Sequence, residues 1–220
     1  MKRMTVVLAL FAGLLLTSCE KSEDIALTGA ASATAVVEPP VQHSYTLNTE
    51  QSVVEWKGAG PAAAHTGSFA MNGTNLEVVN GKLKSGTFVI PIASIQNFDL
   101  PDEVKPILLD HLKSPDFFHM ALYPEAVFTI QRVTPLTREV AGAVAGANKW
   151  VTGDFMMLGQ THQISFPARI DLRGNNLSAE ATFKLDRTRW GMTYAADPAL
   201  GEHHIYPEIE IHLRLSGNRR

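Results

Sequence analysis

Regular alternation of apolar and polar residues is the feature that most constrains how this chain can fold. From Leu177 to Asp186, every second residue is leucine, alanine or phenylalanine, and the residues between them are polar. The runs Ile164–Leu172 and Ile209–Leu215 repeat this pattern. Successive side chains of a strand point to opposite faces, so each run predicts a β-strand with one apolar face. Several such faces have to be buried against a shared interior.

The same reasoning predicts about eight strands along the chain. Asn72–Gly73 and Asn80–Gly81 are typical of tight hairpin turns, and Gly174–Asn176 is a third turn signal. Pro167 lacks an amide donor, which predicts a sheet edge or a bulge at that position. Antiparallel strands of this kind either close into a barrel or stack as two sheets, and periodicity alone does not separate the two. The expected strands lie near 51–57, 65–72, 75–79, 82–92, 126–134, 148–158, 162–173 and 177–186, with a last one at 205–215.

One segment, Leu108–Phe128, interrupts the strands. It begins within a helix pattern, for which Asp102 is the expected N-cap and Pro115 the barrier to continuation. The second half is too apolar for a solvated loop, so we expect it to cover an apolar surface. We interpret the segment as a lid or plug at one end of a barrel. The helix stripe is Val104, Ile107, Leu108 and Leu112, and the apolar cluster is Phe117, Phe118, Met120, Leu122 and Tyr123.

The N-terminus reads as an export signal. Lys2 and Arg3 precede an apolar run, Val6–Leu16, that is short for a membrane span and ends in Thr17-Ser18-Cys19. Leu16–Cys19 resembles the bacterial lipobox, in which the cysteine is acylated and becomes the first residue; a plain signal peptide cut nearby is the alternative. Cys19 is the only cysteine, which excludes an intramolecular disulfide. We therefore predict a lipid anchor at Cys19 in the bacterial cell envelope, on the periplasmic side or at the outer membrane.

Three regions follow from these observations: a signal peptide at 1–18, an acylated cysteine with a disordered tether at 19–43, and a β-domain at 44–217. A tether of this length has an r.m.s. reach of roughly 25–30 Å. Cleavage before Cys19 removes two basic residues and no acidic one, so the formal charge changes from −3 to −5. Such a chain has no basic footprint for nucleic acid.

The predicted domain contains a series of short motifs: Trp56-Lys57-Gly58, His65-Thr66-Gly67-Ser68-Phe69, Phe88 to Ile95, His111 to Phe118, Tyr123 to Phe128, Val151 to Phe155 and Asp186 to Tyr194. In order and spacing these motifs resemble the YceI-like family of bacterial secreted proteins, and the likeness covers nearly all of 45–216. The segment Phe155–Gly159 departs from the family pattern, because a methionine pair stands where small or polar residues are commoner.

The resemblance implies an all-β, eight-stranded antiparallel, lipocalin-like barrel with one short helix near an end. It also implies binding of a hydrophobic amphiphile, such as an isoprenoid, a quinone or a fatty amide, in the apolar lumen, and it leaves a homodimer open. Together with the lipid anchor expected at Cys19, which is an addition to the family pattern, this predicts a membrane-tethered binding protein. A pocket of this kind is lined by aromatic and aliphatic groups. The candidates for ligand binding are Trp56, Phe69, Phe88, Phe117, Phe118, Tyr123, Phe128, Phe155 and Trp190.

Polar candidates are few. The residues predicted to bind a ligand head group are His65, Arg187 and Arg189, and the arginines would do so through charge-assisted hydrogen bonds. The alternatives are that His65 stabilises a turn and that Asp186 pairs with an arginine. The adjacent His203 and His204 point to opposite faces of a strand, so no metal or other cofactor is expected beyond a bound lipid. No catalytic constellation is recognisable, so we predict no enzyme. The rival function is a structural or stress-response lipoprotein with a side-chain-filled barrel and no ligand.

Overall fold

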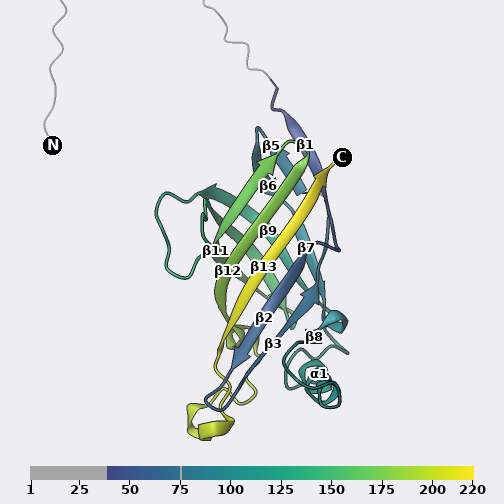
Figure 1. Ribbon diagram of the computed structural model, residues 1–220, viewed down its shortest axis with the longest axis vertical. Coiled ribbons are helices and arrows are strands. Elements are labelled where there is room, and N and C mark those ends of the chain that lie inside the picture. Colours follow the sequence, from purple (N-terminus) through teal and green to yellow (C-terminus); the bar gives the residue numbers. More distant parts are fainter. Residues whose placement is uncertain (1–38, 75) are drawn as a thin grey trace, which may run out of the picture. The chain divides into compact units, whose positions relative to one another are not determined.

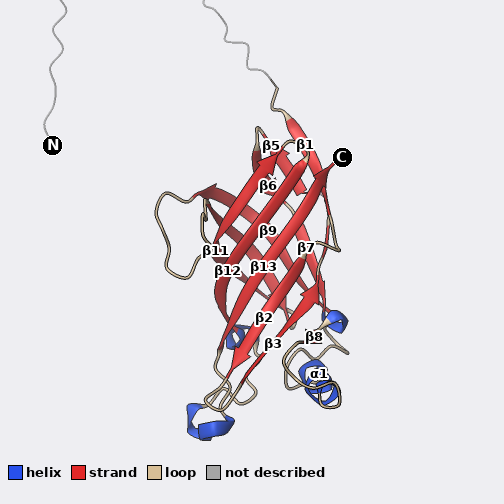
Figure 2. Ribbon diagram, viewed as in Figure 1, coloured by secondary structure: helices blue, strands red, loops and turns tan. Residues whose placement is uncertain are grey.

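Antiparallel strands dominate the structure, a computed structural model that describes residues 39–74 and 76–220 (Figure 2). The predicted signal peptide, Cys19 and the tether up to residue 38 lie outside the described residues. The strands are β1 (Gln42–Leu47), β2 (Val53–Ala59), β3 (Ala64–Ala70), β4 (Asn72–Gly73), β5 (Leu76–Val79), β6 (Lys82–Ser85), β7 (Thr87–Pro91), β8 (Gln96–Asn97), β9 (Glu125–Pro135), β10 (Lys149–Met157), β11 (Gln160–Arg173), β12 (Asn176–Asp186) and β13 (Glu208–Arg219). The helical elements are α1 (Lys105–Lys113) and the 3-10 turns η1 (Ile92–Ser94), η2 (Arg187–Trp190) and η3 (Pro198–His203).

Alternation places one face of each long strand inside. In β12, Leu177, Ala181 and Leu185 are buried, whereas Ser178 and Lys184 are exposed. Burial of the apolar face is the main force that fixes the strand register, because a slip of one residue would turn that face outward.

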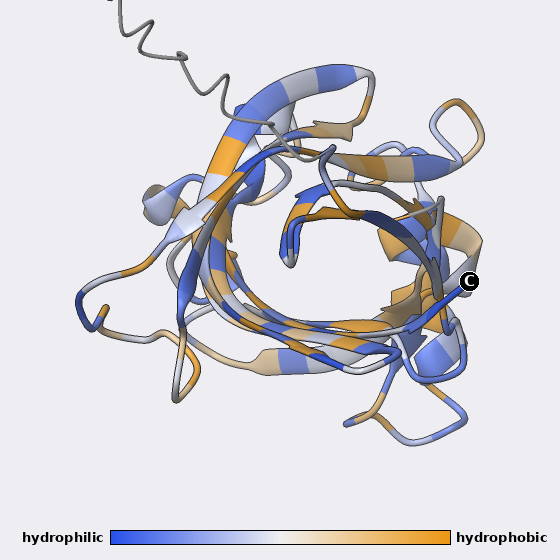
Figure 3. Cartoon of the chain, turned by 90° about the horizontal axis from the view of Figure 1, so that it is seen from above, coloured by the Kyte–Doolittle hydropathy of each residue, from blue (hydrophilic) through white to orange (hydrophobic). Residues whose placement is uncertain are grey.

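The described strands form one sheet that curls into a ring (Figures 1 and 3). Hydrogen-bonded neighbours run β7–β9–β10–β11–β12–β13–β2–β3, and β4 continues β3 and pairs with β7 through only two residue pairs. With β3 and β4 taken as one bent strand, eight strands make the ring, which confirms the predicted all-β barrel. The strands β1 and β8 are additional to the prediction; β5 matches the strand expected near 75–79, and the strand expected near 82–92 is divided into β6 and β7.

The strands β1, β5 and β6 lie outside the ring of eight and close one end of the barrel, which we call the β1 end. β1 pairs with the last part of β13 and with β5, and it begins at Gln42, so the prediction of a disordered tether through His43 is wrong for its last two residues. Leu76 of β5 is completely buried and packs against Gly86 and Gly217. A Cβ at Gly86 would lie 2.5 Å from Cδ2 of Leu76, which shows how tightly this end is filled.

Two of the three predicted turns are confirmed. Asn80 (φ 49°) and Gly81 (φ 70°) both have the positive φ of a type I′ hairpin between β5 and β6. Gly174 (φ 59°) lies in the turn between β11 and β12. Asn72–Gly73 is not a hairpin, because these residues extend β3 and pair with β7. Long-range pairing has overruled a local signal there.

Pro167 marks the position where β11 separates from β12. β11 pairs with β10 at Gln160–Ala168 and with β12 at Arg169–Arg173. The missing amide of Pro167 therefore falls in a stretch with one neighbouring strand, which agrees with the predicted edge. The bulge is elsewhere, between Thr152 and Gly153 of β10. A Cβ at Gly153 would lie 2.4 Å from the ring of Phe128, so glycine is required at this close approach.

Helix α1 lies at the opposite end of the barrel, which we call the α1 end (Figure 1). It ends at Lys113, shortly before Pro115, as predicted, but Val104 and not Asp102 is the N-cap residue. Asp102 instead accepts a hydrogen bond from Lys105 Nζ at 2.8 Å. The predicted apolar stripe is only half buried, since Ile107 is 71% exposed. In the described residues, no helix is long and apolar enough to cross a bilayer.

Candidate ligand-binding site

Two apolar cavities occupy the barrel interior. The first, which we call the lid cavity, has a volume of about 200 Å³ and lies beside α1. The second, the inner cavity, has a volume of about 110 Å³ and extends toward the β1 end. Five residues line both cavities and form what we call the waist: Val54, Ile90, Phe155, Leu185 and Ile211.

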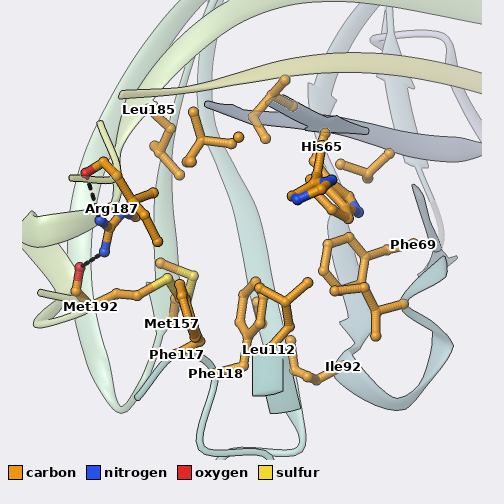
Figure 4. Close-up of a pocket in the computed structure, with 18 of the residues that line it drawn as sticks. His65, Phe69, Ile92, Leu112, Phe117, Phe118, Met157, Leu185, Arg187 and Met192 are labelled. Atoms are coloured by element: carbon orange, nitrogen blue, oxygen red, sulfur yellow. Dashed lines mark hydrogen bonds between the residues drawn. The ribbon is translucent and has the colours of Figure 1, made fainter. Parts of the chain in front are cut away.

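The segment after α1 covers the lid cavity. Phe118 N donates to Leu112 O at 3.0 Å and Met120 N to Lys113 O at 2.9 Å, so the chain folds back beneath the helix. This turn directs Phe117 and Phe118 into the cavity, together with Leu112 (Figure 4). Leu122 does not take part in the cover, because it is 64% exposed.

Aromatic contacts hold the cover against the barrel. The ring of Phe118 meets the ring of Phe69 edge-on, with centroids 5.5 Å apart. His111 of α1 lies between Phe117 and Tyr194, with centroid distances of 5.0 and 4.9 Å. The lid is therefore attached to β3 and to the loop after η2 by side-chain contacts.

Seven of the nine predicted ligand-binding residues line a cavity. Tyr123 and Trp190 line neither. Tyr123 packs against Gly159, and Trp190 is completely buried in the wall, where its Nε1 donates to the carbonyl of Phe155 at 3.0 Å. Their apolar surfaces therefore serve packing, which the alternation pattern could not distinguish from a place in the lumen. Trp56, Phe69, Phe117 and Phe118 line the lid cavity, Phe88 and Phe128 the inner cavity, and Phe155 both.

His65, one of the predicted head-group residues, lies at the lid cavity (Figure 4). Among the described residues, only one of its two ring nitrogens has a hydrogen-bond partner. Its Nδ1 lies 2.7 Å from Oδ2 of Asp99. Burial opposes ionisation of Asp99, but hydrogen bonds from the Thr66 amide, His65 and Asn97 outweigh it and lower the pKa of Asp99 to about 2. An ionised carboxylate only accepts, so Nδ1 of His65 carries the proton and Nε2 remains for a ligand.

Arg187 also lines the lid cavity but is committed to the main chain. It is 2% exposed, and its guanidinium donates to the carbonyl oxygens of Met192, Tyr194 and Ile205 at 2.6, 2.9 and 3.0 Å. Figure 4 shows the bond to Met192. Burial lowers the pKa of this group. These bonds clamp η2 to the following loop, which leaves little capacity for a head group.

Arg189 lies away from both cavities. Its guanidinium is 5.2 Å from the ring centroid of Trp190, and the residue is exposed. Asp186 does not pair with either arginine in the way considered from the sequence; it caps η2 by accepting from Thr188 N at 2.9 Å. The prediction of Arg189 as a head-group ligand is therefore not supported by its position.

Trp56 supplies an additional polar atom that sequence reasoning treated only as apolar. In residues 39–74 and 76–220, its Nε1 is one of three buried side-chain polar atoms without a hydrogen-bond partner. The ring lies across Gly67, the residue paired with Trp56 in β3, where a Cβ would approach Cζ2 to 2.6 Å. A buried donor left unpaired is costly, so it marks a place where a ligand oxygen would be stabilising.

Some of the lining residues that escaped prediction come from loops. Met192 and Ile205 belong to the segment between η2 and β13, which has no periodicity. Asp99 is 34 residues from His65 in sequence, and no local signal connects the two. In the described part of the chain, no group of three or more histidine, cysteine or acidic side chains is arranged to hold a metal ion.

Comparisons with known proteins place this geometry in context. A family model described as YceI-like domain matches residues 45–216, whereas no curated protein matches the chain. BcnA from Burkholderia cenocepacia is similar in structure, with a TM-score of 0.60 and 18% identity, over 77% of this chain and 98% of BcnA. A polyisoprenoid binding domain from Saccharophagus degradans, implicated in plant cell wall breakdown, gives 0.59 and 10% over 81% and 99%. A mutant Campylobacter jejuni YCEI protein with a monobromobimane guest gives 0.54 and 15% over 74% and 87%. At these identities the likeness shows the fold.

Proposed function

This chain belongs to the YceI-like domain family through residues 45–216, and we propose that it is a membrane-tethered binding protein whose barrel holds a hydrophobic amphiphile. The fold supports a hydrophobic ligand-binding role. We assign to this chain an isoprenoid, quinone or fatty amide as ligand, in keeping with the polyisoprenoid binding of the Saccharophagus degradans domain.

The observation that carries the proposal is the pair of apolar cavities beneath the lid. The rival function, a structural or stress-response lipoprotein, requires a barrel filled with side chains. Such a barrel would not contain cavities of about 200 and 110 Å³. Burying a few hundred Å² of ligand surface at ~25 cal/mol per Å² gives several kcal/mol before ordering costs are subtracted. That is enough for binding without any chemical step.

Tethering rests on the sequence. Acylation of Cys19 would anchor the chain in the cell envelope, and the residues between Cys19 and β1 would hold the barrel clear of the headgroups. Replacement of this cysteine, Cys19→Ser, should release the protein from the membrane fraction without changing ligand binding. A variant that stays in the membrane fraction would contradict the lipid anchor.

Identification of a copurified lipid tests the binding function. The protein is extracted gently from its host and divided between native mass spectrometry and organic-solvent extraction. We expect an adduct in the native spectrum and the same lipid in the extract; the spectrum also reports whether two chains associate. A matched sample, delipidated and refolded, should lose the adduct and regain it on addition of the extract. Repeatedly empty spectra, with no uptake by the refolded sample, would refute the proposal.

A further inference from the structure

The two cavities differ in the polar groups that they offer a ligand. The lid cavity is bordered by His65 and by Trp56, whose Nε1 has no partner. Glu180 is the one ionisable residue at the inner cavity, and its carboxylate already bonds to His212 Nε2, at 3.0 Å, and to Arg169. A polar head group is therefore favoured in the lid cavity and disfavoured in the inner cavity.

The polar pair at the lid cavity has both a donor and an acceptor. Trp56 and His65 lie on adjacent strands, and each has a glycine as its cross-strand partner, Gly67 and Gly58; the absence of a side chain at Gly67 lets the Trp56 ring lie across it. The indole Nε1 donates, and in a neutral ring with its proton on Nδ1, facing Asp99, the His65 Nε2 accepts. A hydroxyl or a primary amide satisfies both atoms, whereas an ester can satisfy only the indole.

The inner cavity is a blind compartment for the tail. Its far side is lined by residues such as Leu83 and Leu215, and beyond them the β1 end is closed by the fully buried Leu76. A chain that enters past the lid has to cross the waist at Phe155 and stop short of Leu76. One water-sized group takes ~15–30 Å³ of cavity, so the two volumes enclose on the order of 10 to 20 methylene-sized groups.

We propose that the lumen binds one single-chain amphiphile and limits the length of its tail. The hydroxyl or amide head lies at Trp56 and His65, and the end of the tail lies in the inner cavity. This inference rests on the proposed function and narrows it. A tail much longer than 20 carbons does not fit inside, and a shorter one leaves apolar surface uncovered.

A ladder of straight-chain primary alcohols tests the length limit. The delipidated full-length Cys19→Ser chain is loaded with a fluorescent apolar probe, and alcohols of 6 to 24 carbons displace it. We expect Kd to fall about fourfold per added methylene up to a limit between roughly 10 and 20 carbons, and no further beyond it. The matching methyl esters should bind more weakly at every length. Continued gain to 24 carbons would overturn the inference and leave the proposed function intact, whereas no displacement at any length would count against both.

Matched variants place the limit in the inner cavity. Leu83 and Leu177 are both buried leucines, but only Leu83 lines the cavity. Leu83→Ala should raise the limit by about three carbons, the number that the substitution removes, and Leu177→Ala should leave it unchanged. Ala179→Leu, which fills the same cavity, should lower the limit and serves as the second variant if Leu83→Ala unfolds. Equal limits in all folded variants would overturn the inference.

Discussion

The two ends of this barrel are closed in different ways. At the β1 end, extra strands contribute main-chain hydrogen bonds, and Leu76, Val78 and Leu177 are at most 1% exposed. At the α1 end, the covering helix has no fully buried residue, and aromatic side chains attach it to the rim. Elements with few buried contacts open locally at lower free-energy cost than a packed core. We therefore expect the β1 end, which we call the base, to stay closed, and the α1 end, which we call the cover, to open more readily.

The largest expected effect is at the base. Leu76→Ala should lower the free energy of unfolding by about 4 kcal/mol, because the site is fully buried and Gly86 and Gly217 leave the backbone no space to relax into. Chemical denaturation with urea measures the loss. A loss below about 1 kcal/mol would mean that this end is not a rigid plug, and the contrast between the ends would fail.

At the cover, Phe118→Ala should cost less stability and change ligand exchange more. The ring is half-buried and borders a cavity, so we expect a loss of about 2 kcal/mol together with faster release of a bound apolar probe. Phe183→Ala is the comparison variant, since Phe183 is also half-buried and stacks on Phe166 at 4.3 Å but lines the inner cavity, so that its removal enlarges that cavity without loosening the cover. Equal release rates from the two variants would show that Phe118 forms part of the barrel wall and does not hold the cover closed.

The base and the cover also differed in how far the sequence predicted them. Strict alternation predicted β12 and its buried Leu177 and Leu185, because burial of one strand face is encoded residue by residue. β1 was missed, since QHSYTL is short and its partners, β5 and the end of β13, are remote in sequence. Patterns of periodicity carry no information about which distant strand completes a sheet.

The candidate site shows the same division. The cluster Phe117–Phe118 was predictable as a cover, because adjacent large apolar side chains after a helix have to be buried somewhere. Trp190 and Arg187 were misjudged for a common reason: their roles depend on carbonyl groups, of Phe155 and of the loop 192–206, that only the folded chain brings near. Residue type alone predicted a role for these side chains in ligand binding. Hydrogen bonds to carbonyl groups distant in sequence give them a structural role instead.

A smaller effect is expected from pH at the α1 end. The pKa of Asp99 is about 2 in the folded chain and near 4 when unfolded, so its stabilisation is present above pH 4 and is lost as the pH falls through 2. Asp99→Asn should therefore lose about 1 kcal/mol at pH 7, after discounting for the solvent exposure of the side chain, and only a small part of that at pH 2. Urea denaturation of both proteins at pH 7, 4 and 2 measures the difference. A gap that persists in full at pH 2 would show that the loss is not caused by the carboxylate charge.

The smallest change in stability, and the sharpest test of the cover, is expected at Tyr194. Its ring contacts His111 and Phe117 of the lid segment but is 42% exposed, so Tyr194→Ala should change the free energy of unfolding by about 0.5 kcal/mol or less. Removal of the ring frees one side of the lid, and we expect a several-fold faster transfer of a bound probe to lipid vesicles.

Tyr206 is the matched control for this variant. It has the same 42% exposure, and its carbonyl, like that of Tyr194, accepts a hydrogen bond from Arg187, which an alanine at either position retains. Its ring instead contacts His204, which lies after η3. Tyr206→Ala should therefore leave the transfer rate unchanged. If both variants release the probe at the same rate, ligand does not pass between the lid and the loop after η2, and the cover has to open elsewhere; if only Tyr194→Ala is faster, the aromatic contact of His111 with Tyr194 is what holds the α1 end shut.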